Sequence, residues 1–549
     1  MGLKLKNKLY FLIGGILSLS CLTTKAQLTI NTGATFDIQS GAVVVVESNL
    51  VSNANIIGSG LLRMKGIAIQ NINMNGFAIP RLEIDNVSNT NITGNLKISI
   101  AVAFTNGKFV MGNNNVTLAP TATATGMAAG KFFETNGTGL VDREIIADLS
   151  NSIIPIGLGN DYMPVVITNT GSTYNAASIA VKAKAAASLN KHFRTESYLL
   201  TTWPIIKTGI TGGITNAVAT YTDPSKVFGT EADLKGFYWD GTNWSVSGGS
   251  QNTIANTAGA DITTSAGELY AMNKFVLLNT KIFLQGPFNN LTGLMDDQLR
   301  NTGAYIAGNA PIANLLPSSD PYRTATYSAN FIHVANSVTE SVTNANVFND
   351  QINPDKNIVD WIFLELRSNV TPGNTVIQTR AALLQRDGDI VDVDGISPIY
   401  FKNINPASYA IAVRHRNHLG ISTNPSSFNQ SLDLVANAVK LNFSNPAFSG
   451  NIRGLAGTNF FNDGSVNMMY AGDVNNNKTI KYSGAGNDRA ILLTDLSSIE
   501  TGNVIGYLKS DVNLNRSVKY SGAGNDRAVI LSGVLSNNET VFKSQALVP

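Results

Sequence analysis

A near-exact repeat close to the C-terminus constrains this chain more than any other feature. The first copy, DVNNNKTIKYSGAGNDRAILL, begins at Asp473, and the second, DVNLNRSVKYSGAGNDRAVIL, begins 38 residues later at Asp511. Fifteen of the 21 aligned positions are identical. Each copy opens with Asp-Val-Asn-x-Asn, which places oxygen-bearing side chains on alternate residues. Since a loop that wraps a hard cation needs this spacing, the repeat predicts an extracellular module stabilised by calcium.

The EF-hand loop is the natural comparison for this spacing. Such a loop takes side-chain oxygens from positions 1, 3 and 5, a backbone carbonyl from position 7 and a carboxylate from position 12. Here position 12 is Gly484, and Asp488 follows four residues later. We interpret the Ser-Gly-Ala-Gly stretch as an insertion that still delivers this carboxylate. The predicted calcium ligands are Asp473, Asn475, Asn477, Thr479 and Asp488 in the first loop, and Asp511, Asn513, Asn515, Ser517 and Asp526 in the second.

The residues around the loops complete this prediction. Ile480, at position 8, is expected to hold the first loop against its neighbour. Apolar stretches at 489–496 and 527–535 predict a helix after each loop. With two carboxylates and two asparagines in each loop, calcium binding should be weak, on the order of 0.1–1 mM. The alternative is a pair of Asn-rich turns that bind no metal.

The paired loops resemble the dockerin-type repeat, a duplicated half EF-hand of secreted proteins that handle polysaccharides. This resemblance implies that a partner protein could dock on the repeats. The chain departs from the pattern at position 6, where Lys478 and Arg516 replace the usual glycine and place a cation beside each site.

A second resemblance covers the region before the repeats. The stretches FLQGPFNNLTGLMDDQLR from Phe283, ALLQRDGDIVDVDG from Ala381 and YAIAVRHRNHLG from Tyr409 are similar to a module of secreted adhesin or hemagglutinin-like proteins of Bacteroidota. That family implies a place at the cell surface or outside the cell, often after export by a type IX system. The C-terminal sorting domain of that system is not recognisable here.

The N-terminus has the pattern of a secretory signal peptide. Lysines at 4, 6 and 8 precede an apolar run over 9–22, and cleavage is expected after Ala26. The alternative is a lipid anchor on Cys21, the single cysteine. We therefore expect a secreted or cell-surface protein, and no later apolar run predicts a transmembrane segment.

Patterning along the mature chain predicts a mainly β protein. Period-two alternation with closely spaced Gly and Asn turns predicts a β-solenoid or irregular sandwich over 27–140. A β-sandwich-like region follows over 141–280, and an immunoglobulin-like or transthyretin-like sandwich over 281–430. Residues 431–549 add a β segment and the two dockerin-like loops. With the signal peptide at 1–26, the chain is thus expected to have five parts.

Two polar clusters outside the repeats each allow two interpretations. Asp387, Asp389, Asp392 and Asp394 are either a further calcium site or a solvated turn, and the two Asp-Gly pairs favour the turn. The stretch 414–418, Arg-His-Arg-Asn-His, is either a pocket for an acidic sugar or a solvated or cross-strand-paired strand edge, and we favour the edge.

Aromatic residues and catalytic motifs provide weaker evidence about function than the repeats do. Asp240-Gly241 predicts a hairpin that brings Trp239 and Trp244 together, either to stack on a sugar or, as we favour, to pack within the protein. The sequence holds no P-loop, GxSxG or HExxH motif. Residues 27–140 are too poor in acids for a polysaccharide lyase or hydrolase.

Composition limits the partners. Charged residues make up only 14% of the chain and the net charge is +2. Such a surface has no electrostatic reason to bind nucleic acid or an anionic membrane. We expect a non-catalytic adhesin or extracellular protein that binds a glycan, a cell surface or matrix. The alternative is a carbohydrate-binding accessory protein that docks through its repeats, and a polysaccharide-cleaving enzyme comes last.

Overall fold

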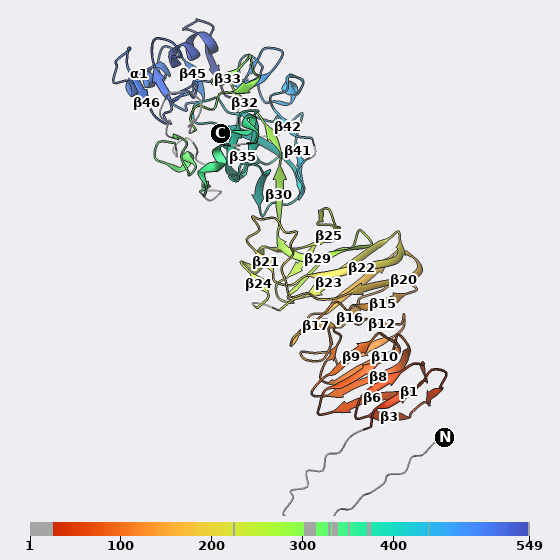
Figure 1. Cartoon of the computed structure of the whole chain (residues 1–549). Coiled ribbons are helices and arrows are strands. Elements are labelled where there is room, and N and C mark those ends of the chain that lie inside the picture. The colour runs from red at the N-terminus through yellow and green to blue at the C-terminus, as the bar shows by residue number, and fades with distance from the viewer. Residues whose placement is uncertain are drawn as a thin grey trace, which may run out of the picture.

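The chain forms an elongated row of β units, with the solenoid at one end and the short helices at the other (Figure 1). This computed structural model describes residues 26–222, 225–300, 314–327, 331, 339–349, 352–369, 375–437 and 439–546. The expected signal peptide, up to residue 25, and Cys21 lie outside these residues. No helix in these ranges combines the length and the apolar character needed to cross a membrane.

The N-terminal unit is solenoid-like, as the period-two pattern predicts. Its strands join in parallel with their counterparts in the next coil, which stacks the coils into two long sheets. The first sheet contains β1 (Leu28–Ile30), β4 (Leu50–Ser52), β7 (Gln70–Asn73), β9 (Thr90–Gly94), β11 (Phe109–Val110), β14 (Phe133–Glu134) and β17 (Ile156–Leu158). The second contains β3 (Val43–Val46), β6 (Leu61–Gly66), β8 (Ala78–Asn86), β10 (Leu96–Asn106), β12 (Val116–Leu118) and β15 (Val141–Ile145). Inward-facing side chains such as Leu62, Ile72 and Leu82 are buried between the sheets.

Asparagines hold successive coils together at the turns. The Asn49 Oδ1 atom accepts the backbone N–H of Asn71 at 2.8 Å, and the Asn95 Oδ1 atom accepts that of Asn115 at 2.8 Å. Asn115 in turn accepts the N–H of Leu140 at 2.9 Å. These N–H groups lie just outside the register in which their strand pairs with that of the preceding coil, so the asparagine side chains satisfy donors that would otherwise be unpaired. The high asparagine content of this region therefore has a structural cause.

The second unit continues the solenoid. β20 (Thr173–Val181) pairs antiparallel with β15, and β22 (Trp203–Thr211), β29 (Ala266–Asn273) and β25 (Leu234–Trp239) extend the same sheet. A second sheet covers it, formed by β16 (Ser152–Ile154), β19 (Val165–Thr170), β23 (Ile214–Thr220), β28 (Thr257–Asp261) and β27 (Ser250–Asn252). One hydrophobic core runs through both units.

The predicted hairpin lies in this second unit. β25 pairs with β26 (Trp244–Ser245), and Trp239 lies opposite Trp244 with ring centroids 5.3 Å apart. Trp244 is buried, and its indole N–H donates to the carbonyl of Asn190 at 3.0 Å. Packing within the protein, the interpretation that we favoured, therefore accounts for Trp244.

The third unit is built on one main sheet. Every residue of its central strand, β35 (Ile358–Arg367), is buried. The sheet order is β40 (Ile421–Ser422), β39 (Ala407–Arg414), β35, β36 (Val376–Gln385), β37 (Asp389–Val391), β31 (Thr280–Lys281) and β42 (Leu441–Asn442). β44 (Asn467–Met469) pairs with β32 (Phe283–Leu284), so the segment between β41 (Gln430–Leu432) and β44 packs into this unit.

The two repeats form a small unit at the end of the row. Helix α1 (Arg489–Asp495) follows the first loop, and α2 (Asp526–Ala528), which continues as a π-helical segment over Val529–Val534, follows the second. The predicted helices are therefore present.

The strands of the repeat unit pair in an unexpected way. β45 (Thr479–Lys481) of the first loop pairs with β48 (Phe542–Ser544), and β47 (Ser517–Lys519) of the second pairs with β46 (Asn503–Ile505). Ile480 packs in a core shared with Val512 of the second loop, but the two loop strands do not pair with each other. The segment after each helix takes the place of the neighbouring loop.

Candidate metal centre

The first loop encloses two buried carboxylates. The Asp473 Oδ2 atom accepts the backbone N–H of Lys478 at 3.2 Å, while its Oδ1 atom is buried without a hydrogen-bond partner. Asp488 reaches the loop from the start of α1, and its oxygens accept the N–H groups of Val474 at 3.0 Å and Lys481 at 2.8 Å. The insertion thus delivers its carboxylate to the loop.

The loop asparagines hold the insertion in place. The Nδ2 atoms of Asn475 and Asn477 both donate to the carbonyl of Gly486 at 2.9 Å. Their Oδ1 atoms accept the N–H groups of Asn477 and Thr479, each at 2.9 Å. All five predicted ligands of the first loop therefore lie in one local network.

The second loop repeats this network. The Asp511 oxygens accept the N–H groups of Asn515 at 3.0 Å and Arg516 at 2.9 Å. Asp526 accepts those of Val512 and Lys519, each at 2.8 Å. Asn513 and Asn515 donate to the carbonyl of Gly524, and the Ser517 N–H donates to the Oδ1 atom of Asn515 at 3.1 Å. The two copies of the sequence thus fold into two copies of one structure.

The backbone at position 6 keeps the conformation that glycine would favour. Lys478 has φ of 69° and Arg516 has φ of 78°, both in the left-handed region. The Arg516 side chain donates to the carbonyl of Gln298 at 2.8 Å in the third unit. The departure from the dockerin pattern therefore changes the side chain at this position without changing the turn.

Burial makes the charged form of all four loop aspartates unfavourable in the absence of a cation. It raises the pKa of Asp473 to about 7 and that of Asp511 to about 6. Burial, together with the negative charge of the loop's first aspartate, raises the pKa of Asp488 and of Asp526 to about 8. A bound divalent cation would reverse this effect because it favours the ionised carboxylates.

The donor set fits calcium. Each loop offers two carboxylates, amide oxygens and backbone carbonyls, which are the oxygen ligands that calcium takes in flexible loops. Among the described residues, no group of three or more His, Cys, Asp or Glu side chains is gathered for a metal. A cation in either loop would therefore depend on the asparagine and backbone oxygens.

A tyrosine–arginine cluster, which the sequence interpretation missed, joins the two copies. The Arg489 Nε atom donates to the Tyr520 hydroxyl at 2.7 Å, and the Arg527 Nε atom donates to the Tyr482 hydroxyl at 2.6 Å. The two hydroxyls are 3.3 Å apart. Each arginine follows a loop carboxylate and reaches the tyrosine of the other copy. The available signal was that both residue types are identical in the two copies.

The segment 414–418 is not solvated, but Arg414 does pair across strands, with Glu365 of β35 at 3.2 Å. Arg416 and Asn417 are fully buried. The Arg416 Nε atom donates to Asp360 at 2.8 Å, and the Asn417 amide donates to the carbonyls of Lys509 at 2.9 Å and Asp511 at 2.8 Å. This segment lies beneath the second loop and binds backbone oxygens there, which is why it is polar without being exposed.

The buried Asp360 carboxylate is electrostatically satisfied, although the Nη2 atom of Arg416 is buried without a hydrogen-bond partner among the described residues. Burial alone would raise the pKa of Asp360, but Arg416 and the hydrogen bond from His415 lower it to about 2. The hydroxyl of Tyr507, from the repeat unit, donates to Asp360 at 2.6 Å. The third unit and the repeats therefore share a buried charged network.

The acidic stretch at 387–394 does not converge on one point. Lys356 contacts Asp387 at 2.5 Å and Asp389 at 2.7 Å, whereas Asp392 pairs with Arg380 at 3.0 Å. Asp394 accepts the backbone N–H of Ser397 at 2.9 Å. Asp387 and Asp389 share Lys356, whereas Asp392 and Asp394 have other partners. The stretch is therefore a turn, as favoured, but it is not a solvated one, because Asp389 and Asp392 are buried.

Comparison with known proteins adds no relative to these observations. No protein-family model, curated protein or solved structure matches the chain.

Proposed function

We propose that this protein is a secreted, non-catalytic adhesin or extracellular binding protein whose C-terminal unit is stabilised by two calcium ions. One observation carries the proposal: each loop buries two carboxylates that form no ion pair with a described residue, and the arrangement occurs twice. The unpartnered Oδ1 atom of Asp473 is the clearest sign, since a buried anionic oxygen without a partner is costly.

Calcium would act by binding the folded loops better than the unfolded chain. For a site with a dissociation constant of about 0.1 mM, about 1 mM free calcium would stabilise the folded state by about 1.4 kcal/mol. Dissociation constants of about 0.1–1 mM are typical of extracellular calcium-binding modules. Calcium would also relieve the repulsion between Asp473 and Asp488, and between Asp511 and Asp526.

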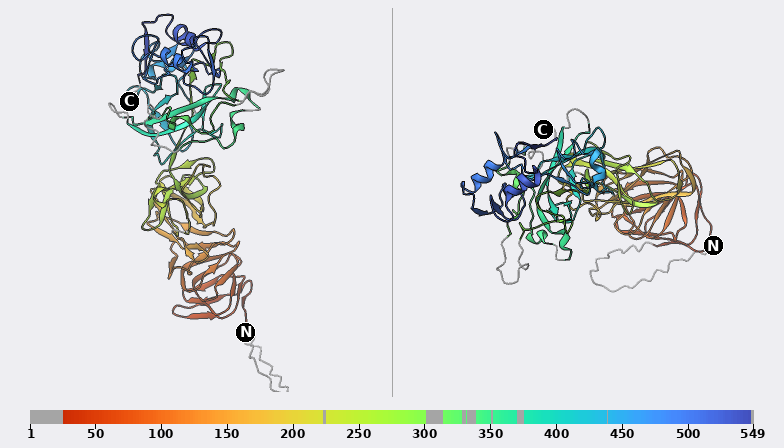
Figure 2. Two further views of the ribbon diagram at one scale, coloured as in Figure 1. Left: turned by 90° about the vertical axis from the view of Figure 1, so that its left-hand side faces the viewer. Right: turned by 90° about the horizontal axis from the view of Figure 1, so that it is seen from above.

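The shape of the chain supports a binding role. Seen from the side and from above, the units lie in a row, with the repeats and the solenoid at opposite ends (Figure 2). Buried contacts stiffen the junctions, such as the pairing of Arg194 with Asp392 between the second and third units. A rigid β rod is suited to presenting a binding face at a distance from its attachment.

Docking through the repeats has less support. Arg416 and Asn417 engage the backbone just before and within the second loop. Arg516 binds the third unit as well. Surface that a docking partner would use is therefore occupied by the chain itself.

Calorimetric titration of the chain from Gln27 onwards with calcium tests the proposal. We expect two sites of sub-millimolar to millimolar affinity, and a higher melting temperature with calcium than with EGTA. Asp473→Asn and Asp511→Asn should each remove one site because each loop loses a charged ligand. Asp240→Asn, in an exposed turn of the second unit, is the matched control and should leave both sites. Absence of heat, together with an unchanged melting temperature, would refute calcium binding.

A further inference from the structure

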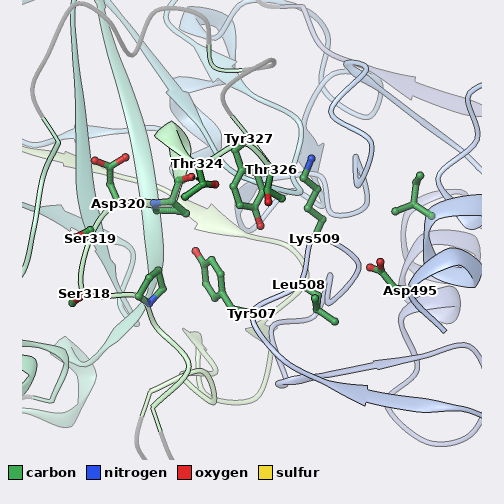
Figure 3. A pocket seen from close by; sticks show the side chains of 13 residues that line it. Ser318, Ser319, Asp320, Thr324, Thr326, Tyr327, Asp495, Tyr507, Leu508 and Lys509 are labelled. Atoms are coloured by element: carbon green, nitrogen blue, oxygen red, sulfur yellow. Dashed lines mark hydrogen bonds between the residues drawn. The ribbon is translucent and has the colours of Figure 1, made fainter. Parts of the chain in front are cut away.

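A cavity of about 630 Å³ lies where the repeat unit meets the third unit. Figure 3 shows Asp320 towards one end of the lining and Asp495 towards the other, with Tyr507, Tyr327, Thr326 and Lys509 between them. This volume is within the range of small-molecule sites, roughly 300–1,000 Å³. Neither unit forms the cavity alone.

Two tyrosines give the cavity fixed aromatic walls. The Tyr507 hydroxyl donates to Asp360 at 2.6 Å, and the Arg416 guanidinium lies 4.2 Å from the centre of its ring. Tyr327 is buried, with the Lys509 ammonium 4.9 Å from its ring centre. Since both rings are held by neighbours, a ligand would meet a site that needs little rearrangement.

The charged groups of the lining are close to balanced. Asp320 pairs with Arg323 at 2.7 Å, and its Oδ1 atom is buried without a hydrogen-bond partner. Asp495 accepts a hydrogen bond from Ser510, and Lys509 forms no ion pair with a described residue. The cavity therefore offers carboxylate acceptors and one ammonium donor without a net attraction for a highly charged ligand.

We propose that this cavity binds a neutral saccharide. Carboxylates accept hydrogen bonds from sugar hydroxyls, an ammonium donates to sugar oxygens, and an aromatic ring contacts the apolar C–H face of a sugar. The partly exposed ring of Tyr507 can make this last contact, whereas the buried Tyr327 supports Lys509. Ser318, Ser319 and Thr326 add hydroxyl groups to the lining. A polyanion would meet Asp320 and Asp495, and an apolar peptide side chain would desolvate them, so both fit less well.

Residues that line the cavity are close in sequence to the predicted calcium ligands of both loops. Asp495 lies on α1, which begins directly after Asp488 of the first loop. Tyr507 and Lys509 lie four and two residues before Asp511 of the second loop. Removal of calcium should therefore weaken saccharide binding, and this part of the inference rests on the proposed function, whereas the site itself does not.

A glycan array of neutral and acidic saccharides, probed with the calcium-loaded chain from Gln27 onwards, tests the site. We expect binding to neutral glycans, followed by calorimetry with the best of them. Asp495→Asn and Lys509→Met should each weaken that binding at least tenfold. Asp463→Asn, in an exposed turn beside a different cavity of the third unit, should leave it unchanged. Melting temperatures of all variants report whether they fold.

Several outcomes would overturn the site. The folded chain could fail to bind any neutral glycan, or it could bind only acidic glycans or peptides. The folded Asp495 and Lys509 variants could also bind the glycan with the affinity of the wild type. Calcium binding without saccharide binding would reject the site and leave the proposed function standing. Saccharide binding without calcium binding would reject the proposed calcium-stabilised function and leave the saccharide site standing.

Discussion

Two residues of the repeats have a strained backbone conformation that the sequence alone does not reveal. Lys478 and Arg516 occupy left-handed backbone, which a side chain makes unfavourable by about 1–2 kcal/mol. Arg516 gains a contact with the Gln298 carbonyl in return. The Lys478 side chain forms no hydrogen bond or ion pair with any residue that the structure describes. The two copies therefore differ in how well the same strain is offset.

Lys478→Gly should stabilise the repeat unit. Glycine removes the left-handed strain but loses more chain entropy on folding, so we expect a net gain of about 0.5–1 kcal/mol in the free energy of unfolding. Urea unfolding measures it. Arg516→Gly is the matched control and should gain less because it loses the bond to Gln298. A loss of stability in Lys478→Gly would contradict this explanation.

His192 should make the chain sensitive to acid. Burial lowers its pKa to about 4 from an ordinary value of 6.5, and its ring stacks on Tyr400 with centroids 4.8 Å apart. Because the folded state binds the proton less well than the unfolded state, stability is full above pH 6.5 and falls as the pH drops towards 4. His192→Phe keeps the stacking and removes the proton site.

Melting curves at pH 7 and pH 5 check this prediction. The melting temperature of the wild type should fall further between the two pH values than that of His192→Phe. The loop aspartates titrate in both proteins, so their contribution cancels in the comparison. Equal falls in the two proteins would show that His192 does not couple folding to pH.

At the scale of elements, the repeats are an interlocked pair. β45 and β47 pair with the segments that follow the helices, and Tyr482 and Tyr520 accept hydrogen bonds from arginines of the opposite copy. One copy alone would leave these donors and strand edges without partners. Two copies are therefore the smallest stable form of this unit.

Tyr482→Phe and Tyr520→Phe should destabilise the pair to similar extents. Each removes the acceptor of one arginine, and a hydrogen bond to a charged group at a half-exposed site contributes about 1–2 kcal/mol. Urea unfolding measures the loss. Tyr409→Phe, whose hydroxyl bonds a local carbonyl of the third unit, serves as the control. A pair of variants as stable as the wild type would show that this cluster does not join the copies.

At the scale of the whole molecule, features formed by residues close together in the sequence could be predicted, whereas contacts between distant segments could not. The loops could be predicted because Asp473 and Asp488 lie within one short segment, and the solenoid because its alternation is local. The burial of Arg416 could not, because its partners, Asp360 and the Leu508 carbonyl, lie far away along the chain. The cavity was missed for the same reason, since it requires the repeats to pack on the third unit.

The rod and its repeats thus form one continuous structure rather than a row of independent modules. Strands of the solenoid sheet continue into the second unit, and a buried network centred on Asp360 joins the third unit to the repeats. Calcium in the loops would stabilise the end of this rod that also holds the cavity.

Anomalous diffraction from crystals of the chain soaked with terbium, a calcium substitute, tests the two cation sites most directly. We predict one peak about 2.3–2.6 Å from oxygens of Asp473 and Asp488, and a second at the same distances from Asp511 and Asp526. Peaks only elsewhere, for example beside the turn at 387–394, or no peak in either loop, would contradict the account.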